Sequence, residues 1–296
     1  MTRELDVWGV VDGVLVQGVI DELSYTCPDP ALEARLVAAE SATRIEKPLP
    51  PDQTQISNYF PAKDEPTNNT SSITAPTIYL TDVKTRVRSS LPKGASLRPT
   101  HMQLMLYRRL LTSLADNTTD PGLLFSRHTL RPMHAFSDSL IAQLGNLDLN
   151  LSQSATQTTL APVESTADVL TELLAHNSLA ALWTLVQREF QLTFPRGAGS
   201  IGTVLRAEYR AQHDGAVLGA RSFIHDEKQL DAYVSDGMRW WRGEREARGV
   251  EIEEAFKCAS CDFADGCTWR AGKVGEATER ARAKTRSTRA ASPLAG

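Results

Sequence analysis

Apolar and β-branched residues gather in short runs along the chain, and these runs predict strands. The first two runs, Leu5–Val11 and Val14–Leu23, are separated by Asp12-Gly13, a dipeptide typical of tight hairpin turns. The second run is almost continuously apolar before it ends in acids, which predicts a strand covered on both faces. A third run, Ile78–Arg86, is rich in β-branched and aromatic residues and predicts another strand.

Helical spacing is clearest between Thr100, which we expect to cap a helix, and Leu114. Its apolar stripe consists of Met102, Met105, Leu106, Leu110, Leu111 and Leu114. Further helices are predicted at Pro30–Ile45, Ala135–Leu144, Thr166–His176 and Leu179–Phe190. A second hairpin is predicted from Gly202–Gln212 and Ala216–His225, followed by a helix from Asp226 to about Gly249. Helices and strands together predict an α/β fold.

Polar segments divide the chain. Residues 46–76 are rich in Pro, Ser, Thr, Asn and Asp and predict a disordered insertion between two strands. Residues 148–159 predict a polar loop, and residues 271–296 lack an apolar stripe and predict a disordered basic tail. We therefore expect one domain over residues 1–270, with a helical region at about 100–192 and a cysteine segment at 256–270.

Composition and charge limit the classes of function. The 296 residues are 41% hydrophobic and 23% charged, which suits a packed core. The net charge of −4 gives no overall basic field, so a nucleic-acid role would need local basic patches. The chain contains no apolar run long enough to span a membrane and opens with neither a signal nor a transit peptide. We expect a monomer without a membrane partner.

Candidate chemistry begins on the third predicted strand, where Asp82 and Lys84 are separated by one residue. Side chains alternate along a strand, so both project from one face. The carboxylate can hold a divalent cation and the ammonium can position a water or neutralise a phosphate oxygen. The same pattern also fits an ordinary solvated strand end.

Asp21 ends the second predicted strand and can supply a second oxygen ligand. Two carboxylates on adjacent strands can share one Mg²⁺, which would stabilise charge developing on a scissile phosphate. Gly18 on the same strand permits close approach of a neighbouring group. Gln103 and Tyr107 are spaced by one helical turn and share a helix face. Taken singly, each of these residues also has an ordinary structural interpretation.

Three of the four cysteines form a compact group, Cys258, Cys261 and Cys267. A two-residue gap lets two thiolates reach one metal, and the third can return from a short loop. Zinc and an iron–sulfur cluster both fit this spacing. The fourth cysteine, Cys27, is far away in the sequence.

Basic and aromatic residues could contact nucleic acid in several places. Arg86 and Arg108 belong to local basic groups near the candidate site. Trp240 and Trp241 lie among arginines, where they could stack on bases or anchor a helix to the core.

The order of these motifs resembles that of the exonuclease V family, a RecB-like branch of the PD-(D/E)XK nucleases. The resemblance rests on Gly18-x-x-Asp21, Asp82-x-Lys84, Gln103-x-x-x-Tyr107, and Cys258-x2-Cys261-x5-Cys267 followed by Trp269, and it extends from Arg3 to Arg270. It implies a restriction-endonuclease-like core, in which a mixed central β-sheet is flanked by helices and carries a helical insertion and a C-terminal cysteine loop.

The resemblance also implies activity and cofactors. It implies a single-stranded DNA exonuclease that uses Mg²⁺, carries a [4Fe–4S] cluster and acts in mitochondrial or nuclear DNA maintenance or repair. Carried over, Asp21 and Asp82 match the metal ligands and Lys84 the catalytic lysine. Gln103 and Tyr107 match the helix motif that supports the site, with Tyr107, Arg86 and Arg108 expected to contact DNA. Cys258, Cys261 and Cys267 match three cluster ligands.

Two departures from the family shape the remaining expectations. The upstream helical region of the family, with its cysteine, does not occur in this sequence, and Cys27 follows the Asp21 strand instead of preceding it. We therefore expect an N-terminally truncated fungal member without the fourth cluster ligand and with impaired activity. The alternatives are a catalytically dead nuclease-fold scaffold and a zinc module that binds nucleic acid.

Overall fold

The computed structural model describes residues 2–45, 76–143, 171 and 174–291. They divide into two compact units, where the sequence predicts a single domain. The first comprises Met1–Ser89 and Gln103–Glu227, and the second Ser90–Met102 and Lys228–Gly296. The predicted disordered insertion, apart from Pro76, and the predicted polar loop lie outside the described residues.

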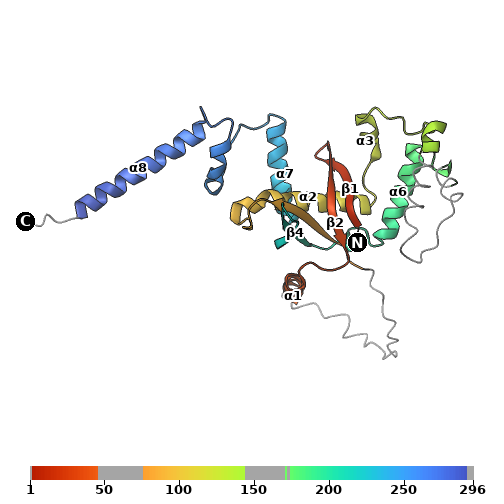
Figure 1. The fold of residues 1–296 in the computed structure, drawn as a ribbon, viewed down its shortest axis with the longest axis horizontal. Helices are drawn as coiled ribbons and strands as arrows, with labels where there is room; N and C mark the ends of the chain where they lie inside the picture. Colours follow the sequence, from red (N-terminus) through yellow and green to blue (C-terminus); the bar gives the residue numbers. More distant parts are fainter. Residues whose placement is uncertain (1, 46–75, 144–170, 172–173, 292–296) are drawn as a thin grey trace, which may run out of the picture. The chain divides into compact units, whose positions relative to one another are not determined.

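A five-stranded sheet organises the first unit (Figure 1). Its strands stand in chain order: β1 Thr2–Val11, β2 Val14–Ser24, β3 Tyr79–Arg86, β4 Val204–Ala211 and β5 Val217–Ile224. The β3–β4 pair is parallel and the other three pairs are antiparallel. The chain is therefore mixed α/β, as predicted, because parallel neighbours require a crossover and this one contains helices.

The β1–β2 hairpin confirms the turn prediction. Asp12 and Gly13 have φ angles of 50° and 77°, so both central residues are left-handed, as a type I′ turn requires. The expectation that β2 is covered on both faces is wrong, because Val14 and Val19 are 37% and 40% exposed. The pairing is antiparallel, and such hairpins commonly leave one face in water.

Helix α2, Arg98–Ala115, packs its apolar side chains into the core of the first unit. It begins at Arg98, directly after the short 3-10 helix η2, Gly94–Leu97, so Thr100 lies inside the helix and is not its cap. The predicted stripe is buried except for Leu106, which is only partly buried. Leu104, outside the predicted stripe, is fully buried too.

The remaining helices of the first unit mostly follow the prediction. They are α1 Pro30–Ile45, α3 Pro121–Arg127 and α6 Leu179–Thr193. Ser178 caps α6 by accepting a hydrogen bond from the Ala181 N–H. Ala135, predicted to start a helix, instead pairs with Ser178 in an isolated bridge, and helical structure begins at residue 138. The predicted helix at 166–176 falls largely outside the described residues.

In the second unit, two elements differ from the prediction. Helix α7, Glu227–Trp241, ends well before Gly249, and Gly243 takes a φ of 71° just beyond it. After the 3-10 helix η4, Ile252–Ser260, residues Thr268–Ala291 form helix α8. The predicted disordered tail is therefore helical as far as Ala291. No helix among the described residues is both long and apolar enough for a membrane span.

Candidate active site

An ion pair joins the acid and the lysine of β3. Lys84 Nζ lies 3.0 Å from Asp82 Oδ2. The Asp82 side chain is only 3% exposed, whereas that of Lys84 is 33% exposed, so the pair lies at the edge of the core. The structure therefore confirms that the two side chains share a face of the strand.

The Asp82 carboxylate is buried, and one of its oxygen atoms lacks a hydrogen-bond donor among the described residues. Its Oδ2 is close to Lys84 but, among the described residues, has no donor in hydrogen-bond geometry. Burial raises the pKa of Asp82, the bond and charge of Lys84 counteract that rise, and the nearby Asp21 charge adds to it. A buried oxygen in this state is suited to a cation, which would take the place of the missing donor.

Asp21 approaches β3 where the two strands separate. The β2–β3 ladder contains three pairs, from Ser24↔Tyr79 to Glu22↔Thr81. Just beyond them Asp21 Oδ2 accepts a 2.6 Å hydrogen bond from the Val83 N–H. The carboxylate thus replaces a strand carbonyl as acceptor and comes near enough to Asp82 to affect its pKa.

Helix α2 completes the arrangement from the side. Lys84 Nζ donates to Gln103 Oε1 at 2.8 Å, and Gln103 Nε2 donates to the Tyr107 hydroxyl at 3.0 Å. The Tyr107 ring lies against Gly18, where an added Cβ would fall 2.3 Å from Cε1. The residues predicted from three separate motifs therefore meet at one place.

The carboxylates here suit a magnesium ion better than a metal that needs many protein ligands. Among residues 2–45, 76–143, 171 and 174–291, no group of three or more His, Cys, Asp or Glu side chains is arranged to hold a metal. Mg²⁺ commonly keeps several waters and binds through one or two carboxylates plus substrate phosphates. Asp21 and Asp82 fit that requirement, since Asp82 Oδ2 accepts no hydrogen bond from the described residues.

A hollow of about 290 Å³ opens beside Asp21, lined by Arg3, Glu4, Asp21, Glu22, Val83 and Arg210. On β4, Glu208 forms ion pairs with Arg206 at 3.0 Å and with Arg210 at 2.7 Å. Sequence reasoning missed this charged row, although the alternation of charges at 206, 208 and 210 places all three side chains on one strand face.

The two arginines expected to contact DNA are engaged within the protein. The Arg86 guanidinium lies over the Tyr209 ring, 5.9 Å from its centroid. Arg108 donates to the Gly202 carbonyl at 2.9 Å and to the Ile201 carbonyl at 3.2 Å, and burial lowers its pKa. These contacts tie α2 to the segment before β4, and a role of Arg108 in DNA binding stays a prediction.

The cysteine segment lies in the second unit. Cys258 belongs to η4, Cys261 follows that helix, and Cys267 precedes α8. All three are free thiols, half-buried or exposed, and Cys267 Sγ accepts from the Arg270 N–H at 3.5 Å. Thiols presented by one short, accessible segment fit a metal or cluster as far as the donor set goes.

Cys27 lies in the first unit and has different neighbours. Burial raises the pKa of its thiol, and Glu33 adds to the rise. The same Glu33 accepts a 2.6 Å hydrogen bond from the Tyr79 hydroxyl. A thiol held protonated is a poor thiolate ligand.

The tandem tryptophans are exposed, Trp240 by 51% and Trp241 by 73%. This excludes the alternative in which Trp241 anchors the helix in a core. Nearby, Arg245 and Arg248 both pair with Asp236, at 3.0 and 3.2 Å. Two exposed indoles beside arginines leave base stacking as the expectation for this segment.

Comparison with known proteins matches this chain to one family model, described as exonuclease V, a 5′ deoxyribonuclease, over residues 1–270. Exonuclease V of Danio rerio is 23% identical over 279 residues, covering 94% of this chain and 52% of the relative. The mitochondrial exonuclease V of Candida glabrata is 23% identical over 312 residues, covering 93% and 59%. The chain thus spans little more than half the length of these relatives.

Proposed function

The chain belongs to the exonuclease V family, and we propose that it is a metal-dependent exonuclease acting on single-stranded DNA. The observation that carries the proposal is the convergence of Asp21, Asp82 and Lys84, supported by Gln103. A mixed sheet with two acids on adjacent, separating strands and a lysine beside them supports a PD-(D/E)XK core.

Asp21 and Asp82 would hold the metal, proposed to be Mg²⁺, which when bound supplies charge neutralisation at the scissile phosphate and a more acidic water. The protein's part is to hold both carboxylates in place. Lys84 favours the charged form of Asp82, and the Val83 N–H orients Asp21.

Lys84 is the group proposed to act on the water or on the phosphate. An ammonium has three N–H donors. Lys84 donates one of them to Gln103, and its Nζ lies 3.0 Å from Asp82 Oδ2, so these two contacts hold the ammonium in place. A donor fixed in this way can orient an attacking water or stabilise charge on a phosphate oxygen.

The cysteine segment is proposed to hold an iron–sulfur cluster through Cys258, Cys261 and Cys267. A [4Fe–4S] cluster takes four ligands, and Cys27, whose thiol pKa is raised by burial, is a poor candidate for the last. The cluster would stabilise a segment that, among the described residues, has little apolar core of its own.

The mitochondrion is the proposed compartment. The support is the name of the Candida glabrata relative, a mitochondrial exonuclease V. DNA maintenance in that organelle would then be the biological role.

A catalytically impaired nuclease-fold scaffold is the second candidate. It is favoured by one observation: among the described residues, no three His, Cys, Asp or Glu side chains are grouped so as to hold a metal. One experiment separates the candidates, the incubation of labelled single-stranded and duplex DNA with the full chain in Mg²⁺ or in chelator. The nuclease degrades single strands in Mg²⁺ alone, whereas the scaffold leaves both substrates intact.

A further inference from the structure

Helix α8, Thr268–Ala291, concentrates positive charge in an acidic protein. It contains seven basic residues and two acidic ones, a net charge of +5, whereas the rest of the chain has 25 basic and 34 acidic residues, a net of −9. The five basic residues of its second half, where no acid occurs, are Arg280, Arg282, Lys284, Arg286 and Arg289. The helix also lies almost entirely beyond residue 270, where the family match ends.

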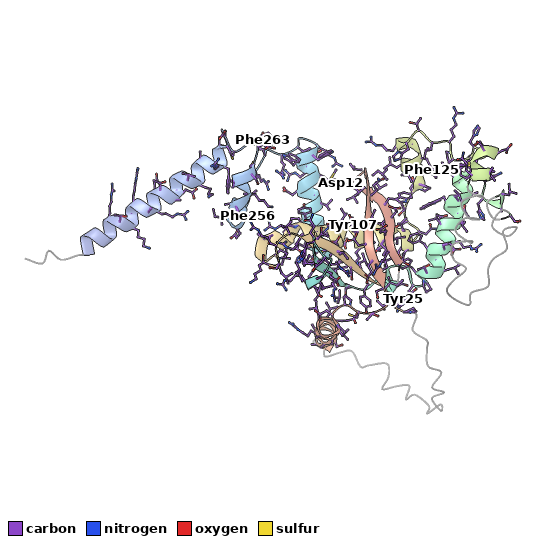
Figure 2. All side chains as sticks on the ribbon, viewed as in Figure 1. Asp12, Tyr25, Tyr107, Phe125, Phe256 and Phe263 are labelled. Atoms are coloured by element: carbon purple, nitrogen blue, oxygen red, sulfur yellow. The ribbon has the colours of Figure 1, made fainter. Side chains whose placement is uncertain are left out.

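Beyond its first two turns the described part of the helix is exposed to solvent. Every residue from Val274 to Arg286 is exposed, and Figure 2 shows side chains of α8 projecting away from its axis. Its ion pairs are local: Lys273 with Glu276 at 3.1 Å, and Glu276 with Arg280 at 3.1 Å. Arg282 and Arg286 form no ion pair with a carboxylate of the described residues.

Arg282 and Arg286 share one face, because they are spaced by four residues, and Arg289 follows three residues later in the sequence. At about 1.5 Å of rise per residue, Arg282 and Arg286 are about 6 Å apart along the axis. Such a row of arginines can contact several phosphates of one polyanion at once. Guanidinium groups are also the side chains best suited to phosphate.

We propose that α8 is a DNA-binding arm that grips the phosphates of single-stranded DNA without reading its sequence. The proposal rests on the nuclease function proposed above. Beyond Trp269 in its first turn the helix contains no aromatic side chain, so the contacts of its basic second half are electrostatic. A membrane surface is the poorer partner, because interfacial helices insert large apolar side chains and the largest one beyond Val274 is alanine.

The test compares the full chain with Arg282→Gln/Arg286→Gln/Arg289→Gln. Binding of a fluorescent single-stranded oligonucleotide is measured in chelator over a salt series, with circular dichroism to confirm that the helix content is kept. Losing three phosphate contacts should flatten the slope of log K against log salt by about 2 and weaken binding roughly 10- to 100-fold at low salt. The control, Arg127→Gln/Arg131→Gln/Arg188→Gln, removes the same charge from exposed positions elsewhere and should retain the wild-type slope.

An unchanged slope in the α8 variant, or an equal loss in the control, would overturn the proposal. So would loss of binding to phosphatidylserine vesicles with DNA binding intact, because it would make a membrane the partner. Cleavage of the same oligonucleotide in Mg²⁺ is measured in parallel. If the wild-type chain binds the oligonucleotide with the predicted salt slope but does not cleave it, the nuclease function is refuted. The proposal that α8 binds DNA would still hold.

Discussion

The Tyr107 ring lies so close to Gly18 that a Cβ at position 18 would fall 2.3 Å from its Cε1 atom. The Tyr107 hydroxyl accepts from Gln103, and Gln103 in turn accepts from Lys84. A glycine on β2 therefore helps set the position of the ammonium on β3.

Gly18→Ala should disturb both stability and activity. The added methyl cannot be accommodated without moving the tyrosine ring, so the free energy of unfolding should fall by about 1–3 kcal/mol. Exonuclease activity should fall as well, because Gln103 loses its fixed partner. Gly237→Ala is the control: its Cβ meets open space, and it should stabilise α7 by up to about 1 kcal/mol. Wild-type values for Gly18→Ala would show that the close packing is unimportant.

Gln103 is a positioning residue, and its removal should lower kcat more than it raises KM. Gln103→Ala leaves Lys84 with Asp82 as its single fixed partner, and a displacement of about 1 Å at the site can cost about 10²-fold in rate. Gln103→Glu retains an acceptor for the ammonium and should restore most of the rate. Steady-state kinetics on an oligonucleotide measure both variants. An equal kcat in the wild type and in Gln103→Ala would show that α2 does not position Lys84 for catalysis.

Asp82→Asn should abolish activity yet stabilise the metal-free protein. Burial raises the pKa of Asp82, so the native state holds this proton more tightly than the unfolded state. The corresponding stability is present in acid and is lost as the pH rises through the raised pKa. In chelator, the variant should therefore melt above wild type at neutral pH, with the difference vanishing below about pH 4.

Added Mg²⁺ should reverse that order. Ligand at 100 times its Kd stabilises the wild type by about 2.7 kcal/mol, and the variant should gain little of this. If the wild type melts at a higher temperature than Asp82→Asn in chelator at neutral pH, the buried Asp82 carboxylate does not destabilise the metal-free protein. That result would contradict its assignment as a metal ligand.

Several of these features follow from the sequence because their signals are local. Asp12-Gly13 and His213-Asp214-Gly215 define hairpin turns, so four of the five strands could be placed in pairs. Asp82 and Lys84 share a face through strand alternation alone. The contacts between motifs are different, because the Gln103–Lys84 bond depends on how α2 docks on the sheet.

The errors also have physical causes. Helix α8 was expected to be disordered for want of an apolar stripe, but Ala, Arg, Lys and Glu have high helix propensity without one. The sequence identifies Arg108 as basic and cannot tell whether its partner is a phosphate or a backbone carbonyl. Strand alternation places Arg206, Glu208 and Arg210 on one face, so the ion pairs of Glu208 could have been predicted from the sequence.

Arg108→Ala should act on stability first. It removes two hydrogen bonds to the Gly202 and Ile201 carbonyls, and an unfolding free energy lower by about 1–3 kcal/mol is expected. Denaturant titration measures this, with the exposed Arg127→Ala as a control of the same chemistry. Full stability combined with weakened DNA binding would instead support a direct contact between Arg108 and DNA.

Serine substitutions at Cys261 and at Cys27 should have different effects on the iron content of the purified protein. Cys261→Ser removes a proposed cluster ligand and should lower iron and the visible absorption of the purified chain. Cys27→Ser should leave both unchanged, because burial and Glu33 raise the pKa of its thiol and so disfavour the thiolate that binds a metal. A colourless wild-type protein that contains zinc would show that the cysteine segment holds zinc and not an iron–sulfur cluster.

The central claim is that Asp82 and Lys84 form the catalytic centre. The most direct test measures Mg²⁺-dependent degradation of single-stranded DNA by the wild type, by Asp82→Ala and by Lys84→Ala. The pair meets at 3.0 Å on β3, and we predict that the wild type releases nucleotides while each variant loses at least about 10²-fold in rate with its fold intact. Glu189→Ala, an exposed acid on α6, should cut at the wild-type rate. If both β3 variants still degrade the DNA at that rate, this site is not the catalytic centre.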